Sequence, residues 1–177
     1  IEFSDRYMIE YFLDLNQLGL YSASYKWGST MLLFVMAFNY AWQPFFLNKE
    51  NQKESGSFES VAMYVTLIFI VVWAFIITYI ESGIVSFQWN GKFLLGKEYW
   101  DSIYIIKWVS LGYLFHGIYL LLLPYIYIQS ETKWVALIRG VGAFTNIVLN
   151  VLLIPRIGIL GASLATCLSF MLMALMV

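Results

Sequence analysis

The sequence predicts an all-α protein built as a polytopic transmembrane helical bundle. Of its 177 residues, 61% are hydrophobic and only 12% are charged, whereas about 25% of the residues in a typical soluble domain are charged. Apolar stretches able to cross the roughly 30 Å of bilayer hydrocarbon recur along the whole chain. Because lipid offers the backbone no hydrogen-bond partners, each of these stretches is expected to be helical.

About five full spans and the end of an earlier one are expected. In chain order they are residues 1–13 (the partial span), 22–47, 61–80, 103–128, 134–154 and 159–177. Two of the full spans, 61–80 and 159–177, contain no Asp, Glu, Lys or Arg. Each of the other full spans contains a single basic residue, which is Lys26, Lys107 or Arg139.

Short polar segments separate the expected spans. Residues 14–21, 129–133 and 155–158 predict tight turns between antiparallel helices, and residues 48–59 predict a polar loop. The longer segment 81–101 contains several Trp, Phe and Leu residues. It therefore fits either a piece lying in the headgroup layer or a plain loop.

Composition and motifs exclude several classes of function. A net charge of −1 gives no basic footprint for nucleic acid, and a single cysteine gives no disulfide framework. The phosphate-binding G-x-x-x-x-G-K-[ST] motif is missing, which argues against ATP hydrolysis. His116 has no second His or Cys nearby, so we expect no metal, no other cofactor and no catalytic residues. Because the chain starts at Ile1 and stops at Val177 inside apolar stretches, we expect further protein beyond both ends.

Four charged residues gather in the first, partial span. Glu2, Arg6 and Glu10 are spaced i, i+4, i+8 and so share one helix face, with Asp5 beside Glu2. Charges inside a bilayer are costly and call for a reason. One interpretation is a self-neutralised stripe of ion pairs near the membrane boundary. The other is that Arg6 contacts an anionic substrate and that Asp5 binds a coupling cation.

A second polar stripe lies in the span 134–154. Arg139, Asn146 and Asn150 fall within about 40° of one another on a helix. This narrow stripe predicts the wall of a hydrated cavity. The alternatives are that Arg139 reaches outward to the nearby membrane surface and that the two Asn residues join neighbouring helices.

Lys26 begins a polar flank on the span 22–47. A cation at this position either faces a cavity or extends to the membrane surface. The candidate substrate-binding residues are therefore Arg6, Lys26, Arg139, Asn146 and Asn150, and the candidate ion-coupling residue is Asp5.

The order and spacing of several motifs resemble the second half of Wzx-type lipid-linked oligosaccharide flippases. These proteins belong to the multidrug/oligosaccharidyl-lipid/polysaccharide exporter superfamily. The motifs are DRY at 5–7, LGLYS at 18–22, AFNYAWQPFF at 37–46, LGKEY at 95–99, NIVLN at 146–150 and IPRIGILGASLAT at 154–166.

The resemblance implies a two-lobed transporter in which residues 1–177 form the C-terminal lobe and an N-terminal lobe lies outside the chain. It implies a multi-pass protein of the bacterial or archaeal cytoplasmic (inner) membrane that is not an enzyme. Its substrate would be an undecaprenyl-pyrophosphate-linked glycan, flipped for export of O-antigen or exopolysaccharide, and polysaccharide assembly proteins would be further partners. The cations Arg6, Lys26 and Arg139 would suit the pyrophosphate.

Other functions remain open from the sequence. Within the same superfamily they are a drug/cation antiporter, for which Asp5 and Glu2 would supply the carboxylates, and a peptidoglycan-precursor flippase. A membrane-embedded acyl- or glycosyltransferase is an alternative of a different class, and so is a scaffold without transport activity. A transferase would need acid–base residues in a pocket, and the spans contain few of them.

Overall fold

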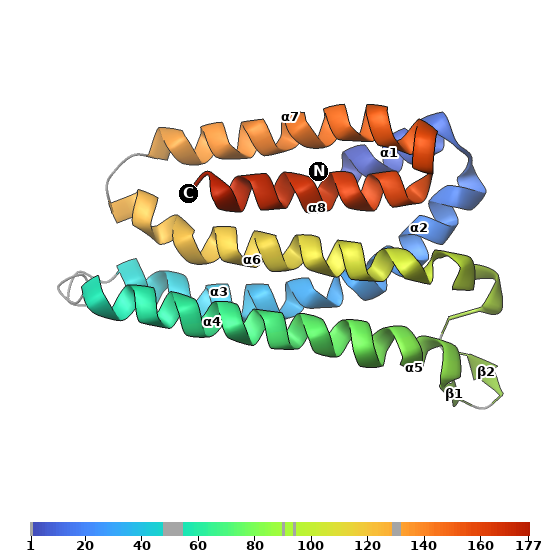
Figure 1. Ribbon diagram of the computed structural model, residues 1–177, viewed down its shortest axis with the longest axis horizontal. Helices are drawn as coiled ribbons and strands as arrows, with labels where there is room; N and C mark the ends of the chain where they lie inside the picture. Colours follow the sequence, from blue (N-terminus) through green and yellow to red (C-terminus); the bar gives the residue numbers. More distant parts are fainter. Residues whose placement is uncertain (1, 48–54, 90, 94, 129–131) are drawn as a thin grey trace.

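The computed structural model describes residues 2–47, 55–89, 91–93, 95–128 and 132–177. Within these ranges the chain is almost entirely helical, which confirms the predicted all-α class (Figure 1). The helices are α1 (Glu2–Phe12), α2 (Leu15–Gly28), α3 (Thr30–Leu47), α4 (Ser55–Phe75), α5 (Glu81–Ser86), α6 (Ile106–Ile128), α7 (Thr132–Ile157) and α8 (Ile159–Leu175).

Three helical segments are long and apolar enough to cross a membrane, which indicates a membrane protein. They are Ser60–Ile84, Lys97–Tyr127 and Thr132–Ile157. Each contains or overlaps a stretch that the sequence predicts as a span. The apolar helix α8 is shorter, at 17 residues.

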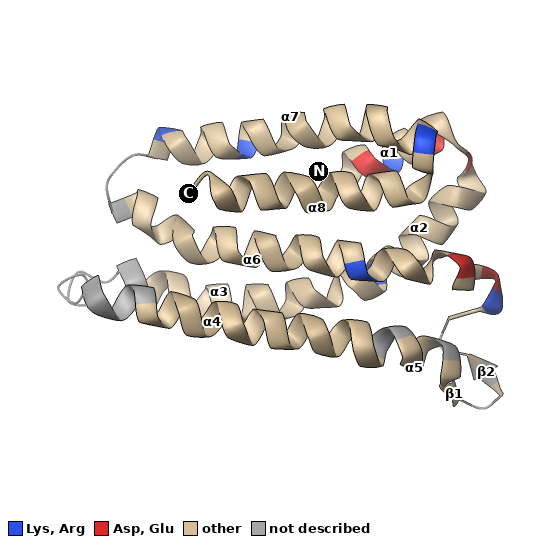
Figure 2. Ribbon diagram, viewed as in Figure 1, with Lys and Arg blue, Asp and Glu red and all other residues tan. Residues whose placement is uncertain are grey.

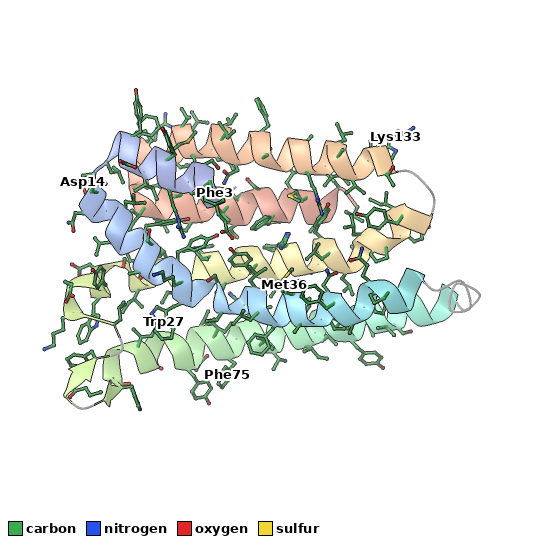
Figure 3. The ribbon with its side chains drawn as sticks, turned by 180° about the vertical axis from the view of Figure 1, so that it is seen from behind. Phe3, Asp14, Trp27, Met36, Phe75 and Lys133 are labelled. Carbon is green, nitrogen blue, oxygen red and sulfur yellow. The ribbon has the colours of Figure 1, made fainter. Side chains whose placement is uncertain are left out.

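The stretch predicted as one span over 22–47 is two helices in the structure. Helix α2 starts earlier, at Leu15, because the side chain of Asp14 accepts a hydrogen bond from the backbone N–H of Gln17 and caps the helix. Helix α2 then ends at Gly28, and α3 starts at Thr30. Figure 3 shows α2 running obliquely from Asp14 to Trp27, where it meets α3.

Side-chain hydroxyls mark this interruption. Ser29 Oγ donates to the carbonyl of Lys26 at 2.9 Å, and Thr30 Oγ1 donates to the carbonyl of Trp27 at 2.7 Å. Such bonds compete with the regular backbone ladder of a helix and bend it. Because α2 already starts at Leu15, most of the segment expected to be a turn at 14–21 is helical instead.

The segment 81–101 has regular structure. A π-helix (Ile76–Ile80) joins α4 to α5, and the strands β1 (Gln88–Trp89) and β2 (Lys92–Phe93) pair in an antiparallel hairpin. A 3-10 helix, η3 (Lys97–Ile105), then leads directly into α6. The expected loop at 48–59 lies mostly outside the described residues.

The turn between α7 and α8 is tighter than expected. Helix α7 continues through Pro155 to Ile157, and Gly158 reverses the chain with a φ of 64°. Only glycine adopts this backbone conformation at low cost. The result is a helical hairpin, and α8 packs between α7 on one side and α6 on the other (Figure 1).

The remaining helices complete the bundle around α6 and α8. Helix α3 packs on α6, α4 lies beside α3 and α6, and α1 lies against α2, α7 and α8. Long stretches of α3, α4 and α8 are free of charge (Figure 2). The outward faces of α4 and α7 carry exposed apolar side chains such as Val71 and Phe144, as expected of surfaces that meet lipid.

Candidate functional site

Asp5 is the central residue of the candidate site. Helix α1 turns Asp5 and Ile9, one turn apart, into the bundle, and both are fully buried. The opposite face of α1 exposes Phe3, Tyr7 and Tyr11. The helix therefore brings a carboxylate to a position from which water is excluded.

Four side chains from three other helices donate hydrogen bonds to this carboxylate. Asn150 Nδ2 at 2.6 Å and Asn146 Nδ2 at 3.0 Å bind Oδ1. Thr166 Oγ1 at 2.5 Å and Tyr21 OH at 3.2 Å bind Oδ2. The two amides are on the same face of α7 because they are spaced i, i+4. Each carboxylate oxygen thus contacts two polar groups: the amides donate to Oδ1, and the hydroxyls can donate to a charged Oδ2 or accept from a protonated one.

The Asp5 site, defined as Asp5, Tyr21, Asn146, Asn150 and Thr166, has no positive charge beside it. No ion pair to Asp5 is found in the described part of the chain. The neighbouring Arg6 points elsewhere, with its guanidinium carbon 5.9 Å from the centre of the Tyr25 ring. A buried charge without a partner is strongly unfavourable. The site therefore calls either for a bound cation or for a proton on the carboxylate itself.

The Asp5 site also contains an oxygen that has no partner. Asn150 Oδ1 is buried and accepts no hydrogen bond from any described residue. Asn146 Oδ1, by contrast, accepts from Ser4 Oγ at 2.8 Å and from Asn150 Nδ2 at 3.2 Å. Buried polar atoms in native proteins are nearly always paired. An unpaired amide oxygen next to an ionised carboxylate is a ready ligand for a small cation.

An open pocket lies at the start of α1, where this helix meets α6, α7 and α8. It has a volume of about 410 Å³ and is lined by Glu2, Phe3, His116, Arg139, Ala143, Phe170 and Met173. Arg139 donates through Nε to Tyr119 OH at 3.1 Å. Glu2 accepts a hydrogen bond from Tyr113 OH, and that hydroxyl is 2.7 Å from Tyr25 OH. His116 Nδ1 is buried and has no partner among the described residues.

The structure divides the predicted substrate-binding residues between different places. Asn146 and Asn150 are fully buried and bind Asp5, so they do not line the open pocket. Arg139 does line it. The three residues share a helix face, but a helix rises about 1.5 Å per residue, so Arg139 and Asn150 lie about 16 Å apart along α7.

The other two predicted cations, Arg6 and Lys26, belong neither to the Asp5 site nor to the open pocket. Arg6 is half-buried against Tyr25, and Lys26 is exposed in the last turn of α2. No pattern in the sequence distinguishes Tyr21 or Thr166, because an isolated hydroxyl in an apolar helix is common. The spacing of Asn146 and Asn150 could have indicated a shared partner, but not its identity.

The cation that this site could hold follows from its ligands. In the described part of the chain no three His, Cys, Asp or Glu residues come together, so ligands for a transition metal are lacking there. The Asp5 site offers one carboxylate with amide and hydroxyl oxygens, which are ligands for hard cations. No family model, no curated protein and no solved structure matches this chain.

Proposed function

We propose that this chain is one lobe of an ion-coupled membrane transporter that flips an undecaprenyl-pyrophosphate-linked oligosaccharide. The observation that carries the proposal is the buried Asp5 carboxylate, which has four hydrogen-bond donors and no cation among the described residues. The substrate follows from the resemblance of the sequence to Wzx-type flippases. The membrane would be the bacterial or archaeal cytoplasmic membrane.

The coupling ion is a monovalent cation that binds at Asp5. One carboxylate balances one positive charge, and the Thr166 hydroxyl oxygen and the Asn150 amide group both contact that carboxylate and could share in coordinating the cation. If the side-chain amide of Asn146 or Asn150 rotates by half a turn, its oxygen takes the place of the NH₂ group beside the carboxylate and can bind a cation. This set of oxygens suits Na⁺, and a proton can replace it by neutralising the carboxylate directly.

Ion binding at this site is linked to the positions of the helices. The ligands come from α1, α2, α7 and α8, so binding stabilises one arrangement of these four helices over any other. Helix α1 also carries Glu2 into the open pocket, where Tyr113 binds it. Loss of the cation would free α1, and the lobe would rock against an N-terminal lobe around the substrate.

The open pocket is the proposed contact for the charged part of the substrate. Arg139 is bound only through Nε among the described residues, which leaves its terminal nitrogens for phosphate oxygens. Arg6 and Lys26 are further proposed cations along the path of the pyrophosphate. The glycan would occupy the hydrated space and the lipid tail would remain in the bilayer.

Arg139→Ala in the full-length gene product is expected to reduce export about tenfold or more, because a hydrogen bond to a charged group contributes about 1.5–3 kcal/mol. The assay is recovery of surface glycan in a flippase-null cell, with the amount of protein in the membrane measured in parallel. Arg156→Ala is the matched control, since Arg156 lies on the same helix and, among the described residues, bonds only to the Leu152 carbonyl. Export that is equally unaffected in both variants would exclude Arg139 from the substrate site.

The Asp5 site also fits a drug/cation antiporter, which needs a buried carboxylate as well. The same cells separate the two functions. A flippase restores surface glycan, whereas an antiporter lowers the accumulation of a cationic dye and restores no glycan.

A further inference from the structure

A second site lies on the opposite side of the bundle, between α4 and α6. Trp73, Ile77, Lys107, Trp108 and Leu111 line a groove of about 280 Å³. We call it the Lys107 groove. Ile77 belongs to the π-helix that follows α4, and π-helical segments are frequent at functional sites.

Lys107 is an unusual residue for this surface. It is exposed, and it is the second residue of α6, at the start of the stretch 108–128 that contains no Asp, Glu, Lys or Arg. Exposed side chains of the neighbouring helix α4, among them Val71 and Phe75, are apolar, and Figure 3 shows Phe75 pointing away from the bundle. Lys107 forms no ion pair with any residue in the described ranges. An unpaired ammonium group facing lipid is costly.

Two tryptophans hold the lysine at the groove. Trp73 Nε1 donates to the backbone carbonyl of Lys107 at 3.4 Å, which joins the two helices. The Lys107 ammonium lies 5.9 Å from the centre of the Trp108 ring. The indole N–H of Trp108 has no acceptor in the part of the chain that the structure describes. The groove therefore presents two hydrogen-bond donors, the ammonium and this N–H, above an apolar wall.

We propose that the Lys107 groove binds one anionic phospholipid. Its phosphate accepts hydrogen bonds from Lys107 Nζ and Trp108 Nε1, and an acyl chain lies against Ile77 and Leu111. The negative headgroup supplies the charge that the lysine lacks, and Trp side chains favour the headgroup region of a bilayer. This site does not depend on the proposed transport.

Native mass spectrometry of the purified full-length protein tests the proposal. Phosphatidylglycerol and phosphatidylcholine with identical acyl chains are titrated separately. The wild type is expected to bind phosphatidylglycerol about fivefold more tightly, as one basic residue near a headgroup provides. Lys107→Gln should remove this preference. Lys133→Gln is the matched control, because Lys133 is also exposed but lies at the start of α7.

Two further variants keep the test decisive if Lys107→Gln does not fold. Trp108→Phe retains the ring but removes the N–H, and should weaken the binding of both lipids, because both carry the phosphate that accepts this hydrogen bond; unchanged binding would contradict the proposal. Leu111→Trp fills the groove and should weaken the binding of both lipids. Equal binding of the two lipids by the wild type would overturn the proposal, and so would equal effects of Lys107→Gln and Lys133→Gln.

Discussion

Asp5→Asn is expected to reduce export by the full-length protein to background while leaving its amount in the membrane unchanged. Asparagine has almost the same shape as aspartate, so packing around α1 is preserved. It has no charge to balance a cation, and its NH₂ group can donate to the hydroxyls of Thr166 and Tyr21 while its oxygen accepts from Asn146 and Asn150. A transporter that cannot bind the coupling ion cannot use the gradient of that ion to drive the substrate across the membrane. Surface glycan in a flippase-null cell is the measurement.

The matched control for this variant is Asp14→Asn. Asp14 is exposed and caps α2 by accepting the N–H of Gln17, a role in which Asn performs as well as Asp. The control should export like the wild type. Full export by the Asp5→Asn variant would show that Asp5 takes no part in ion coupling.

Gly161→Ala is expected to cause the largest loss of stability. A Cβ atom at this position would lie 2.6 Å from the backbone carbon of Leu153 and 2.8 Å from the nitrogen of Ile154. These are backbone atoms of α7 and cannot turn aside as a side chain would, so α7 and α8 must move apart. Overpacking of this kind costs about 1–3 kcal/mol. The measurement is the thermal unfolding temperature of the protein in detergent.

Gly140→Ala provides the comparison for this effect. Gly140 is also helical, but a Cβ there meets nothing within 4 Å. The substitution should leave stability unchanged or raise it by up to about 1 kcal/mol, since alanine favours helix over glycine. Equal unfolding temperatures for the two variants would contradict the close packing of α7 on α8. That packing also places Thr166 next to Asn146, so Gly161→Ala should weaken cation binding as well.

The sequence was informative about the helices because a backbone in lipid must form its hydrogen bonds within its own segment, which a helix does. The apolar lengths of 61–80, 103–128 and 134–154 correspond to three helical segments able to cross a membrane. The interruption at Ser29 could not be foreseen, because the apolar stretch continues through it. What ends α2 is local hydroxyl bonding and the approach of Gly28 to α6, where a Cβ would lie 2.7 Å from Val109 Cβ.

The candidate site was only partly predictable for a related reason. Helical periodicity tells which residues share a face, and it grouped Asn146 with Asn150 correctly. It does not tell which helix that face meets, so their contact with Asp5, more than a hundred residues away along the chain, was not evident. It also grouped Arg139 with them, although the rise of the helix places Arg139 at another depth. Tertiary packing alone brings Tyr21 and Thr166 to the carboxylate.

Binding of radioactive Na⁺ to the purified full-length protein is the most direct test of the site around Asp5. The measurement belongs at alkaline pH, where protons compete least for the carboxylate. Saturable binding of a single equivalent is expected for the wild type and for Asp14→Asn, with none for Asp5→Asn. Wild-type protein that binds no Na⁺, or Asp5→Asn protein that binds as much as the wild type, would contradict the account.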